Sequence, residues 1–419
     1  MVKKISETAL DSACHLDDLI SAAAELVPTL RERAPEAENL RRMPDATVTD
    51  LKRAGMHKIY MPKRYGGFEM DWGAHWKVSR EIGRGCGSTA WTVGLVFSHV
   101  MWIARFPPDA QEEFFSTHKD PIVATGSAGG GGIEGADGGY VLNGRWGFLS
   151  GVHHADCVMV VAKLGDAKMF SHFLMLMPDQ YKIEDTWYSE GLSGTGSTHI
   201  TVTDAFVPAY RVLELEHLLG PNPPGSVLHD SYIYKVRTPP YQKSWFSGVL
   251  AGISLGALEQ YCDLTKARRG QMFKESIADQ VPVQVRVGES VAEIEAANMI
   301  FDNYNRVLHE NGSSGNLELS GDSLLKSKRD MTFGAQLCLS ACDRLSGMMG
   351  VTGQTGDNPV QRHFRDCRTI TTHIELNWDH TFSPTGKHRL GLSTGDPLVD
   401  DPVNSDNQGP DAAVLGKSM

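Results

Sequence analysis

The 419-residue sequence contains no long hydrophobic run, no dense cluster of basic residues and no paired cysteines. No window approaches 18 uninterrupted apolar residues, so no segment is expected to span a membrane. The formal net charge is -11 with scattered Lys and Arg, which argues against an electrostatic grip on nucleic acid or anionic lipid. The seven cysteines lack paired spacing, which is typical of free thiols in a reducing cytoplasm. The beginning, MVKKISETALDSACHLDDL, has no apolar segment after its lysines, so no secretory signal is predicted.

Two apparent motifs do not support the chemistry that they suggest. GGGIEG, from Gly130 to Gly135, formally satisfies the G-x-G-x-x-G pattern of dinucleotide-binding folds. That pattern requires a following helix, whereas ADGGYVLNGRW has the composition of a hairpin, so we interpret the segment as a glycine loop between strands and expect no NAD(P)H site. Cys338 and Cys342 lie on one face of a predicted helix with no further Cys or His at metal-ligand spacing. We therefore interpret them as core residues and predict no metal site.

Hydrophobic patterning divides the chain into three parts. Residues 1–119 carry apolar side chains at helical spacing, including the almost entirely apolar segment STAWTVGLVFSHVMWIARF, which predicts a buried helix. Residues 120–219 contain short segments rich in β-branched and aromatic residues, separated by Gly, Asn and Asp. Residues 220–419 return to long amphipathic helices. This order predicts an α+β protein with a helical N-terminal domain, a central antiparallel β-barrel or sandwich, and a C-terminal helical bundle.

Four segments together resemble the acyl-CoA dehydrogenase family. They are AGMHKIYMPKRYGGFEMDW, VLNGRWGFLSGVHHADCVMVV, SEGLSGTGSTHITVTDAFVP and PVQRHFRDCR, and they are collinear over most of the chain. The resemblance implies that the central domain presents a flavin-facing hairpin. It also implies that the C-terminal helices form a four-helix bundle and that the protein is a homotetramer.

The segment after Arg365-Asp366 departs from the dehydrogenases of this family. They place a glutamate base eight residues after the Asp, where this sequence has Ile374. Glu375 is one residue later, which would turn it about 100° around a helix. His373 instead resembles the histidine of two-component flavin-dependent monooxygenases with the same fold, which include the oxygenase components for hydroxyphenylacetate, chlorophenols, steroid-derived phenols and dibenzothiophene.

That second resemblance implies an oxygenase component. It would take reduced FMN or FAD from a separate NAD(P)H-dependent flavin reductase and react it with O2 to form a C4a-hydroperoxyflavin. The product would be a hydroxylated aromatic compound, with a phenol as the expected substrate.

Three residues are expected to be catalytic. His373 would be the base, since an ordinary histidine pKa of about 6.5 suits deprotonation of a phenol near neutral pH. A hydrogen-bonded core histidine is the alternative, and His380, two turns later, is the second candidate for the base. Ser150 would hold the N5 side of the flavin, or else it is an ordinary turn serine. His99 would donate to flavin or substrate, or else a backbone carbonyl satisfies it.

Further contacts are expected on the hairpin, on TGSAGG and in KARRGQMF. Trp146 and Phe148 should share one face of a strand, and Trp91 should line the cavity or the core. Arg268 or Arg269 would reach flavin phosphates across a subunit interface, unless both are solvated surface residues. The predicted flavin-binding residues are Trp146, Gly147, Phe148, Ser150, Thr125, Gly126, Ser127 and Arg269, and the predicted substrate-binding residues are His99, Trp91 and His373.

Three other functions remain open at this stage. The first is a dehydrogenase that keeps its flavin bound and oxidises an acyl thioester. The second is an oxygenase of the same fold that acts on nitrogen or sulfur. The third is a non-catalytic scaffold or sensor. The sequence does not choose between FMN and FAD, nor does it identify the substrate.

Overall fold

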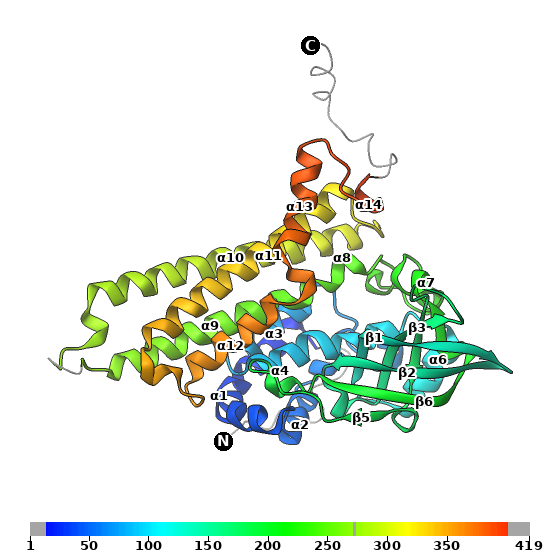
Figure 1. The fold of residues 1–419 in the computed structure, drawn as a ribbon, viewed down its shortest axis with the longest axis horizontal. Helices are drawn as coiled ribbons and strands as arrows, with labels where there is room; N and C mark the ends of the chain where they lie inside the picture. Colours follow the sequence, from blue (N-terminus) through cyan, green and yellow to red (C-terminus); the bar gives the residue numbers. More distant parts are fainter. Residues whose placement is uncertain (1–13, 271–273, 401–419) are drawn as a thin grey trace, which may run out of the picture.

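The computed structural model describes residues 14–270 and 274–400, with helices at both ends of the chain and a sheet between them (Figure 1). The N-terminal helices are α1 (Leu16–Leu40), α2 (Asp45–Arg53), α3 (Ala74–Gly83), α4 (Gly87–Trp91), α5 (Val100–Ile103) and α6 (Pro108–Thr117). Among the described residues, no helix is long and apolar enough to cross a membrane.

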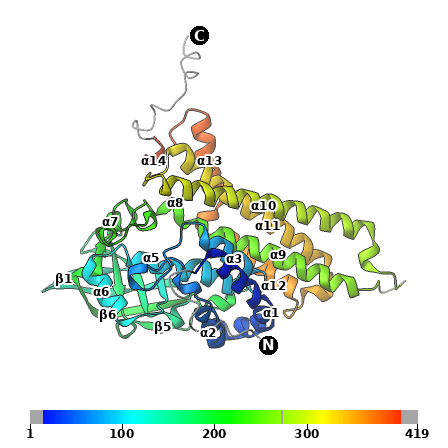
Figure 2. The same cartoon turned by 180° about the vertical axis from the view of Figure 1, so that it is seen from behind.

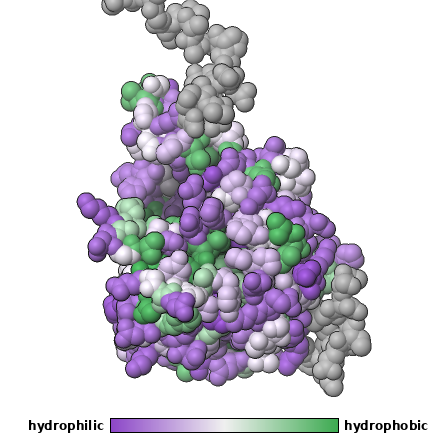
Figure 3. Space-filling model, turned by 90° about the vertical axis from the view of Figure 1, so that its right-hand side faces the viewer, coloured by the Kyte–Doolittle hydropathy of each residue, from purple (hydrophilic) through white to green (hydrophobic). Residues whose placement is uncertain are grey.

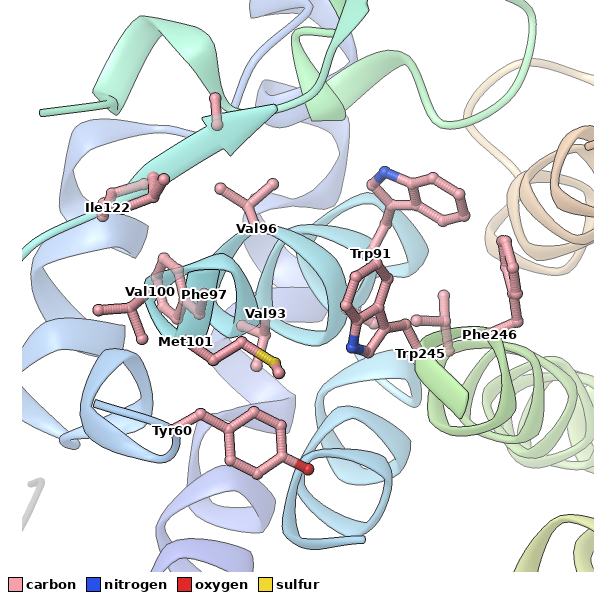
Figure 4. Packing of buried hydrophobic residues seen from close by; sticks show 14 of the residues in the cluster. Tyr60, Trp91, Val93, Val96, Phe97, Val100, Met101, Ile122, Trp245 and Phe246 are labelled. Carbon is pink, nitrogen blue, oxygen red and sulfur yellow. The ribbon is translucent and has the colours of Figure 1, made fainter. Parts of the chain in front are cut away.

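The apolar segment predicted as one buried helix is interrupted. After α4 the chain forms a π-helical turn, η3 (Thr92–Val96), then a 3-10 turn, η4 (Phe97–His99), before α5 begins. At Gly94 an added Cβ would lie 2.9 Å from Ser79 Oγ, so only glycine lets η3 approach α3 this closely. Figure 4 shows this stretch from Trp91 to Met101, with Phe246 facing Trp91 from a neighbouring helix. π-helical turns of this kind are frequent at functional sites.

The central region forms one seven-stranded sheet. The strands are β1 (Val123–Ala136), β2 (Gly139–Leu149), β3 (Cys157–Leu164), β4 (His172–Leu176), β5 (Lys182–Glu184), β6 (Thr198–Pro208) and β7 (Val212–Glu214), in the order β5-β6-β2-β1-β3-β4-β7. The expected closed barrel is wrong, because the short strands β5 and β7 form open edges. The expected all-antiparallel pairing is also wrong, since β2 folds to one side of β1 and leaves β3 to pair parallel with β1 on the other.

The glycine-rich motif lies inside strand β1 and not in a loop. Gly131 pairs with Gly144 of β2, and an added Cβ at either position would lie 2.7 Å from the indole of Trp146. The glycines therefore make room for a large buried ring. The interpretation as a loop was wrong, while the absence of a helix after the motif agrees with rejecting a dinucleotide fingerprint.

Long helices follow the sheet. They are α7 (Leu215–Leu219), α8 (Pro239–Gln242), α9 (Ser244–Ala267), α10 (Val281–Ser313), α11 (Gly321–Met348), α12 (Pro359–Thr371), α13 (Trp378–Arg389) and α14 (Pro397–Asp400). Helices α9, α10, α11 and α12 pack on one another, and Cys338 and Cys342 are fully buried there with free thiols, which confirms that they are core residues.

Helix α9 also joins the two helical regions. It packs against α3, where an added Cβ on Gly83 would lie 2.8 Å from Cα of Gly252. From behind, α1 and α3 lie between the sheet and the long helices (Figure 2). The sheet end of the molecule is mostly hydrophilic with separate hydrophobic patches (Figure 3).

Candidate functional site

Ser150 lies in the turn that follows β2 and is almost fully buried. Its Oγ accepts a hydrogen bond from Nε1 of Trp91 at 2.9 Å and lies 2.7 Å from Oγ of Ser197. The serine therefore ties the hairpin to α4 and to the loop before β6. This placement is more specific than that of an ordinary turn serine, which bonds to its own turn.

Trp146 and Phe148 do not share a face. Trp146 is fully buried and its Nε1 donates to the carbonyl of Val161 at 2.8 Å, while the Phe148 side chain is 62% exposed. The cause is the backbone of Phe148, whose φ of 61° interrupts the alternation of the strand. The exposed Phe148 ring contacts Trp187 and His199, and it remains available to a ligand.

His99 is buried and mostly satisfied by the protein. Its Nδ1 lies 3.1 Å from the carbonyl of Val123, its Nε2 lies 3.5 Å from Oγ1 of Thr125, and its ring packs 5.3 Å from that of Trp245. Burial lowers the pKa of His99 to about 4, so the ring is neutral at pH 7. Since Nδ1 donates to the carbonyl, the lone pair is on Nε2. Of the two alternatives for His99, the structure favours the backbone partner.

The remaining predicted flavin-binding residues of β1 and β2 differ in burial. Gly126 is buried against Leu149, whereas Ser127 is exposed. An added Cβ at Gly147 would lie 2.7 Å from the His199 imidazole, so this glycine lets His199 pack across the strand. Thr125 contacts His99, and later in the TGSAGG segment Ala128 and Gly129 pair with Gly147 and Trp146 of β2.

His373 closes a cluster of three rings. Its ring centroid lies 5.0 Å from that of Phe246 on α9 and 6.2 Å from that of Trp91, and these two partners lie 5.7 Å apart. The indole of Trp91 thus contacts both Ser150, by a hydrogen bond, and His373, by its ring. Two candidate residues far apart in the sequence are brought together through one side chain.

His373 does not lie on a helix, contrary to expectation. Helix α12 ends at Thr371, and Nδ1 of His373 accepts from the backbone N–H of Glu375 at 3.2 Å. Asn377 then caps α13, with its Oδ1 accepting from the N–H of His380. Two successive caps break the helical register. The expected helix through Ile374 and Glu375 is therefore wrong, as is the helical relation between His373 and His380.

Glu375 is held by an ion pair. Its carboxylate lies 2.6 Å from Nζ of Lys243, and this cation, together with His373, holds the pKa of Glu375 below its usual value against the effect of burial. A carboxylate that is paired and acidic is a poor base. Glu375, the glutamate nearest the position of the dehydrogenase base, is thus engaged by Lys243.

The surroundings of His373 lower its pKa. The largest cause is the atoms packed around the ring, Lys243 adds to it, and Glu375 acts in the opposite direction. The side chain is nevertheless accessible to solvent on its outer side. A neutral imidazole that is walled on one side and open on the other suits a group that meets a small molecule.

The two arginine candidates lie at the far end of α9, away from the sheet (Figures 1 and 2). Arg268 donates to the carbonyls of Met348 and Met349, so its guanidinium is occupied. Arg269 is exposed and donates to carbonyls of its own turn. Neither can meet Ser150 of the same chain, so the prediction for Arg269 depends on a second copy of the chain.

Sequence reasoning missed three residues at this site. Ser197 and Thr195 continue the hydrogen bonds of Ser150, and Trp245 brings its indole beside His99. Nε1 of Trp245 and Oγ1 of Thr198 are buried without a partner in the described chain. Because a buried polar atom without a partner costs free energy, these atoms fit a site that receives a polar aromatic ligand. The segment GTGST itself contained the signal for Ser197, since three of its five residues carry hydroxyl groups.

The structure also has a surface hollow that lies away from this site. This hollow of about 410 Å³ beyond β7, lined by residues including Glu216, Asn222 and Arg237, contains none of the candidate residues. In the described parts of the chain no three His, Cys, Asp or Glu side chains are grouped so that they could hold a metal ion.

Comparisons with known proteins identify the family to which this chain belongs. The N-terminal domain of acyl-CoA dehydrogenase matches residues 20–117, and its C-terminal domain matches residues 244–378. The flavin-dependent monooxygenase oxygenase subunit HsaA of Rhodococcus jostii is 30% identical over 383 residues, covering 89% of this chain and 98% of the relative. The oxygenase component of the FADH(2)-dependent resorcinol hydroxylase of Rhizobium sp. is 30% identical over 385 residues, covering 89% and 94%. The structure of XiaF from Streptomyces sp. in complex with FADH2 and glycerol is 25% identical with a TM-score of 0.83, covering 91% and 97%.

Proposed function

This chain belongs to the oxygenase components of flavin-dependent monooxygenases that share the acyl-CoA dehydrogenase fold, and from that premise we propose that it hydroxylates a phenolic substrate between Ser150 and His373. The enzyme uses reduced flavin and O2, and the flavin is reduced by a separate reductase. The observation that carries the assignment of residues is the indole of Trp91, which bonds to Ser150 and packs against the ring of His373.

The residues of the site fit a flavin ring. Ser150 has one lone pair left after its two hydrogen bonds, and Phe148 offers an exposed aromatic face. Oγ1 of Thr198 is buried and has no hydrogen-bond partner among the described residues. Reduced flavin, when bound, supplies the electrons that activate O2 for insertion into the substrate. The protein keeps water from that reaction with buried side chains, of which Trp91 and Phe246 form the part nearest His373.

His373 acts as the base on the phenol hydroxyl. Deprotonation makes the ring carbon beside the hydroxyl electron-rich, which favours attack on an electrophilic oxygen. In the structure Nδ1 accepts from the N–H of Glu375, so the neutral ring carries its proton on Nε2. For Nε2 to take the phenol proton, the ring proton must move to Nδ1, and the weak capping bond of 3.2 Å is then lost.

His99 and Trp245 form the inner end of the substrate site. Both side chains are buried and neutral, and Nε1 of Trp245 can donate a hydrogen bond to a ligand. An aromatic compound with a neutral oxygen substituent matches this chemistry better than a carboxylate, since no cation faces it from these two residues. Whether the oxygen atom is transferred to carbon, nitrogen or sulfur depends on which substrate this site binds.

The test uses purified protein, chemically reduced FMN or FAD, and a panel of phenols under ¹⁸O2. We expect a product that contains one ¹⁸O atom, and no product when NADH and oxidised flavin are supplied without a reductase. Ser150→Ala should divert the reaction toward H2O2. Release of H2O2 alone from every phenol, together with oxidation of an acyl thioester by an artificial acceptor, would establish the dehydrogenase instead.

The broader organisation is part of the proposal. We assign three domains, 1–119, 120–219 and 220–419, because the sheet begins at Val123 and β7 ends at Glu214. Helices α9, α10, α11 and α12 are proposed to be a four-helix bundle through which a homotetramer assembles, so that Arg269 meets the flavin of another subunit. The free cysteines support a cytoplasmic location.

A further inference from the structure

A buried row of hydrogen bonds leads away from Ser150. Nε1 of Trp91 donates to Ser150 at 2.9 Å, Ser150 lies 2.7 Å from Ser197, and Ser197 lies 2.6 Å from Thr195. Thr195 Oγ1 donates to the carbonyl of Leu192 at 2.8 Å. All five residues are at least nine-tenths buried, so water does not compete for these bonds.

The hydrogen bond at the far end of the row sets the direction of the protons in it. Thr195 Oγ1 donates to the carbonyl of Leu192, so its single hydroxyl proton is used there. Ser197 must then donate to Thr195, and Ser150 must donate to Ser197, because two oxygens at 2.6–2.7 Å without a proton between them would repel. The indole N–H of Trp91 can only donate, which agrees with the same direction.

We propose that Ser197 and Thr195 are positioning residues that turn Ser150 into a hydrogen-bond acceptor for bound flavin, and so make the site selective for reduced flavin. This inference rests on the proposed function. Reduced flavin carries a proton on N5, whereas N5 of oxidised flavin is itself an acceptor. If the only proton of Ser150 is donated to Ser197, Ser150 can accept a hydrogen bond from N5–H of reduced flavin. Toward N5 of oxidised flavin it would present a lone pair to a lone pair, which is repulsive.

The row is anchored at its far end. Leu192 has a φ of 56°, which is uncommon for a side chain of this size, and its N–H donates to Oδ1 of the buried Asp366 at 2.6 Å. Asp366 belongs to α12, the helix that leads to His373. The backbone carbonyl that sets the proton direction is therefore held by the same helix that places the proposed base.

The test compares the dissociation constants of reduced and oxidised FMN and FAD in anaerobic titrations. We expect Ser197→Ala to leave Ser150 free to donate, and to lower the preference for reduced flavin about tenfold, since Ser150 could then form a hydrogen bond with either redox state. A tenfold change corresponds to a shift of about 30 mV in the two-electron potential of the bound flavin. Ser197→Thr, which keeps a hydroxyl, should restore the preference.

Thr195→Val and Thr195→Ser form a second pair, which serves if Ser197→Ala does not fold. Loss of the preference in Thr195→Val and its retention in Thr195→Ser would support the inference. An equal loss of affinity for both redox states would overturn it, because that is the effect of a purely structural defect. If the unaltered protein binds neither form of flavin, the proposed function fails as well, and the two failures are thereby distinguished.

Discussion

The two sides of the proposed site are built differently. Around Ser150 every polar partner is buried and hydrogen-bonded, from Trp91 to Leu192. Around His373 the chain has left its helix, the side chain is open to solvent on its outer side, and the ring accepts one weak hydrogen bond from the backbone. Ser150 and His373 both contact the indole of Trp91, so they differ in their surroundings although they share a neighbour.

The contrast matches what each side must do. A residue that holds a cofactor in one orientation needs partners that fix its rotamer and its proton. A histidine base takes up one proton and releases it again in each turnover, so its ring must be able to change tautomer and to exchange protons with solvent. We therefore expect substitutions on the buried side to change stability and cofactor binding, and substitutions on the open side to change the rate of the reaction.

The largest effect is expected on the open side, in activity alone. His373→Gln should lower the rate of hydroxylation by about 10²- to 10⁴-fold, because it removes the base. Its free energy of unfolding should change by no more than about 2 kcal/mol, since one cap and the packing of the ring on Phe246 and Trp91 are lost. The matched control is His380→Gln, which changes an exposed histidine of α13. Product formation and chemical denaturation measure the two quantities, and equal rates in the two variants would remove His373 from the mechanism.

On the buried side, Asp366 should make stability depend on pH. Burial raises the pKa of Asp366 to about 6, above the value of about 3.9 in an unfolded chain. The folded protein therefore binds the proton more tightly, and stability falls as the pH rises from about 4 to about 6. Relative to Asp366→Asn, the unaltered protein should lose about 1 to 3 kcal/mol over this range. Chemical denaturation at pH 4 and pH 7 measures it, and a constant difference between the two proteins would contradict the expectation.

Trp91→Phe tests the side chain that both sides share. The phenylalanine keeps a ring against Phe246 and His373 but removes the N–H that donates to Ser150. We expect a loss of about 1 kcal/mol in the free energy of unfolding and a larger share of H2O2 among the products. Substrate oxidation that stays fully coupled to flavin oxidation would show that Ser150 does not need this donor.

The smallest effect is a displacement of the pH profile. Lys243 lowers the pKa of His373 and neutralises Glu375, which otherwise raises it. The rate should therefore fall only below the usual pKa of histidine in the unaltered protein, and Lys243→Met should move this acid limb to higher pH. Lys243→Arg keeps the charge and should leave the profile in place. An unmoved profile in Lys243→Met would mean that the limb belongs to another group.

The sequence alone predicted the parts of the site that depend on local pattern. The hairpin around Ser150, the helices that flank it and the displacement of the glutamate follow from motifs and periodicity. The conformation of Phe148 could not be predicted, because a bulky residue at positive φ has no sequence signature. The bond between Trp91 and Ser150 was equally hidden, since it joins two elements whose packing depends on the whole fold.

Some errors could have been avoided. Asn377 is a residue type that often caps the start of a helix, and its side chain accepts from the N–H of His380, three residues later. The β-branched residues Thr371 and Thr372, just before His373, are weak helix formers. These residues indicate the end of one helix and the start of another, whereas the apolar spacing alone suggested a continuous helix. The parallel pairing of β1 with β3 was not predictable from strand composition, because it depends on which side of β1 the hairpin folds.

The π-helical turn Thr92–Val96 has a consequence for how this chain can change by insertion and deletion. Such a turn holds one residue more than an α-helical turn. Deleting one residue there would restore an α-helical turn, and the residues on either side, Trp91 and His99, would keep nearly the same relative orientation, because one turn of either helix returns to the same face. The chain could therefore gain or lose this one residue without displacing the site residues that flank it.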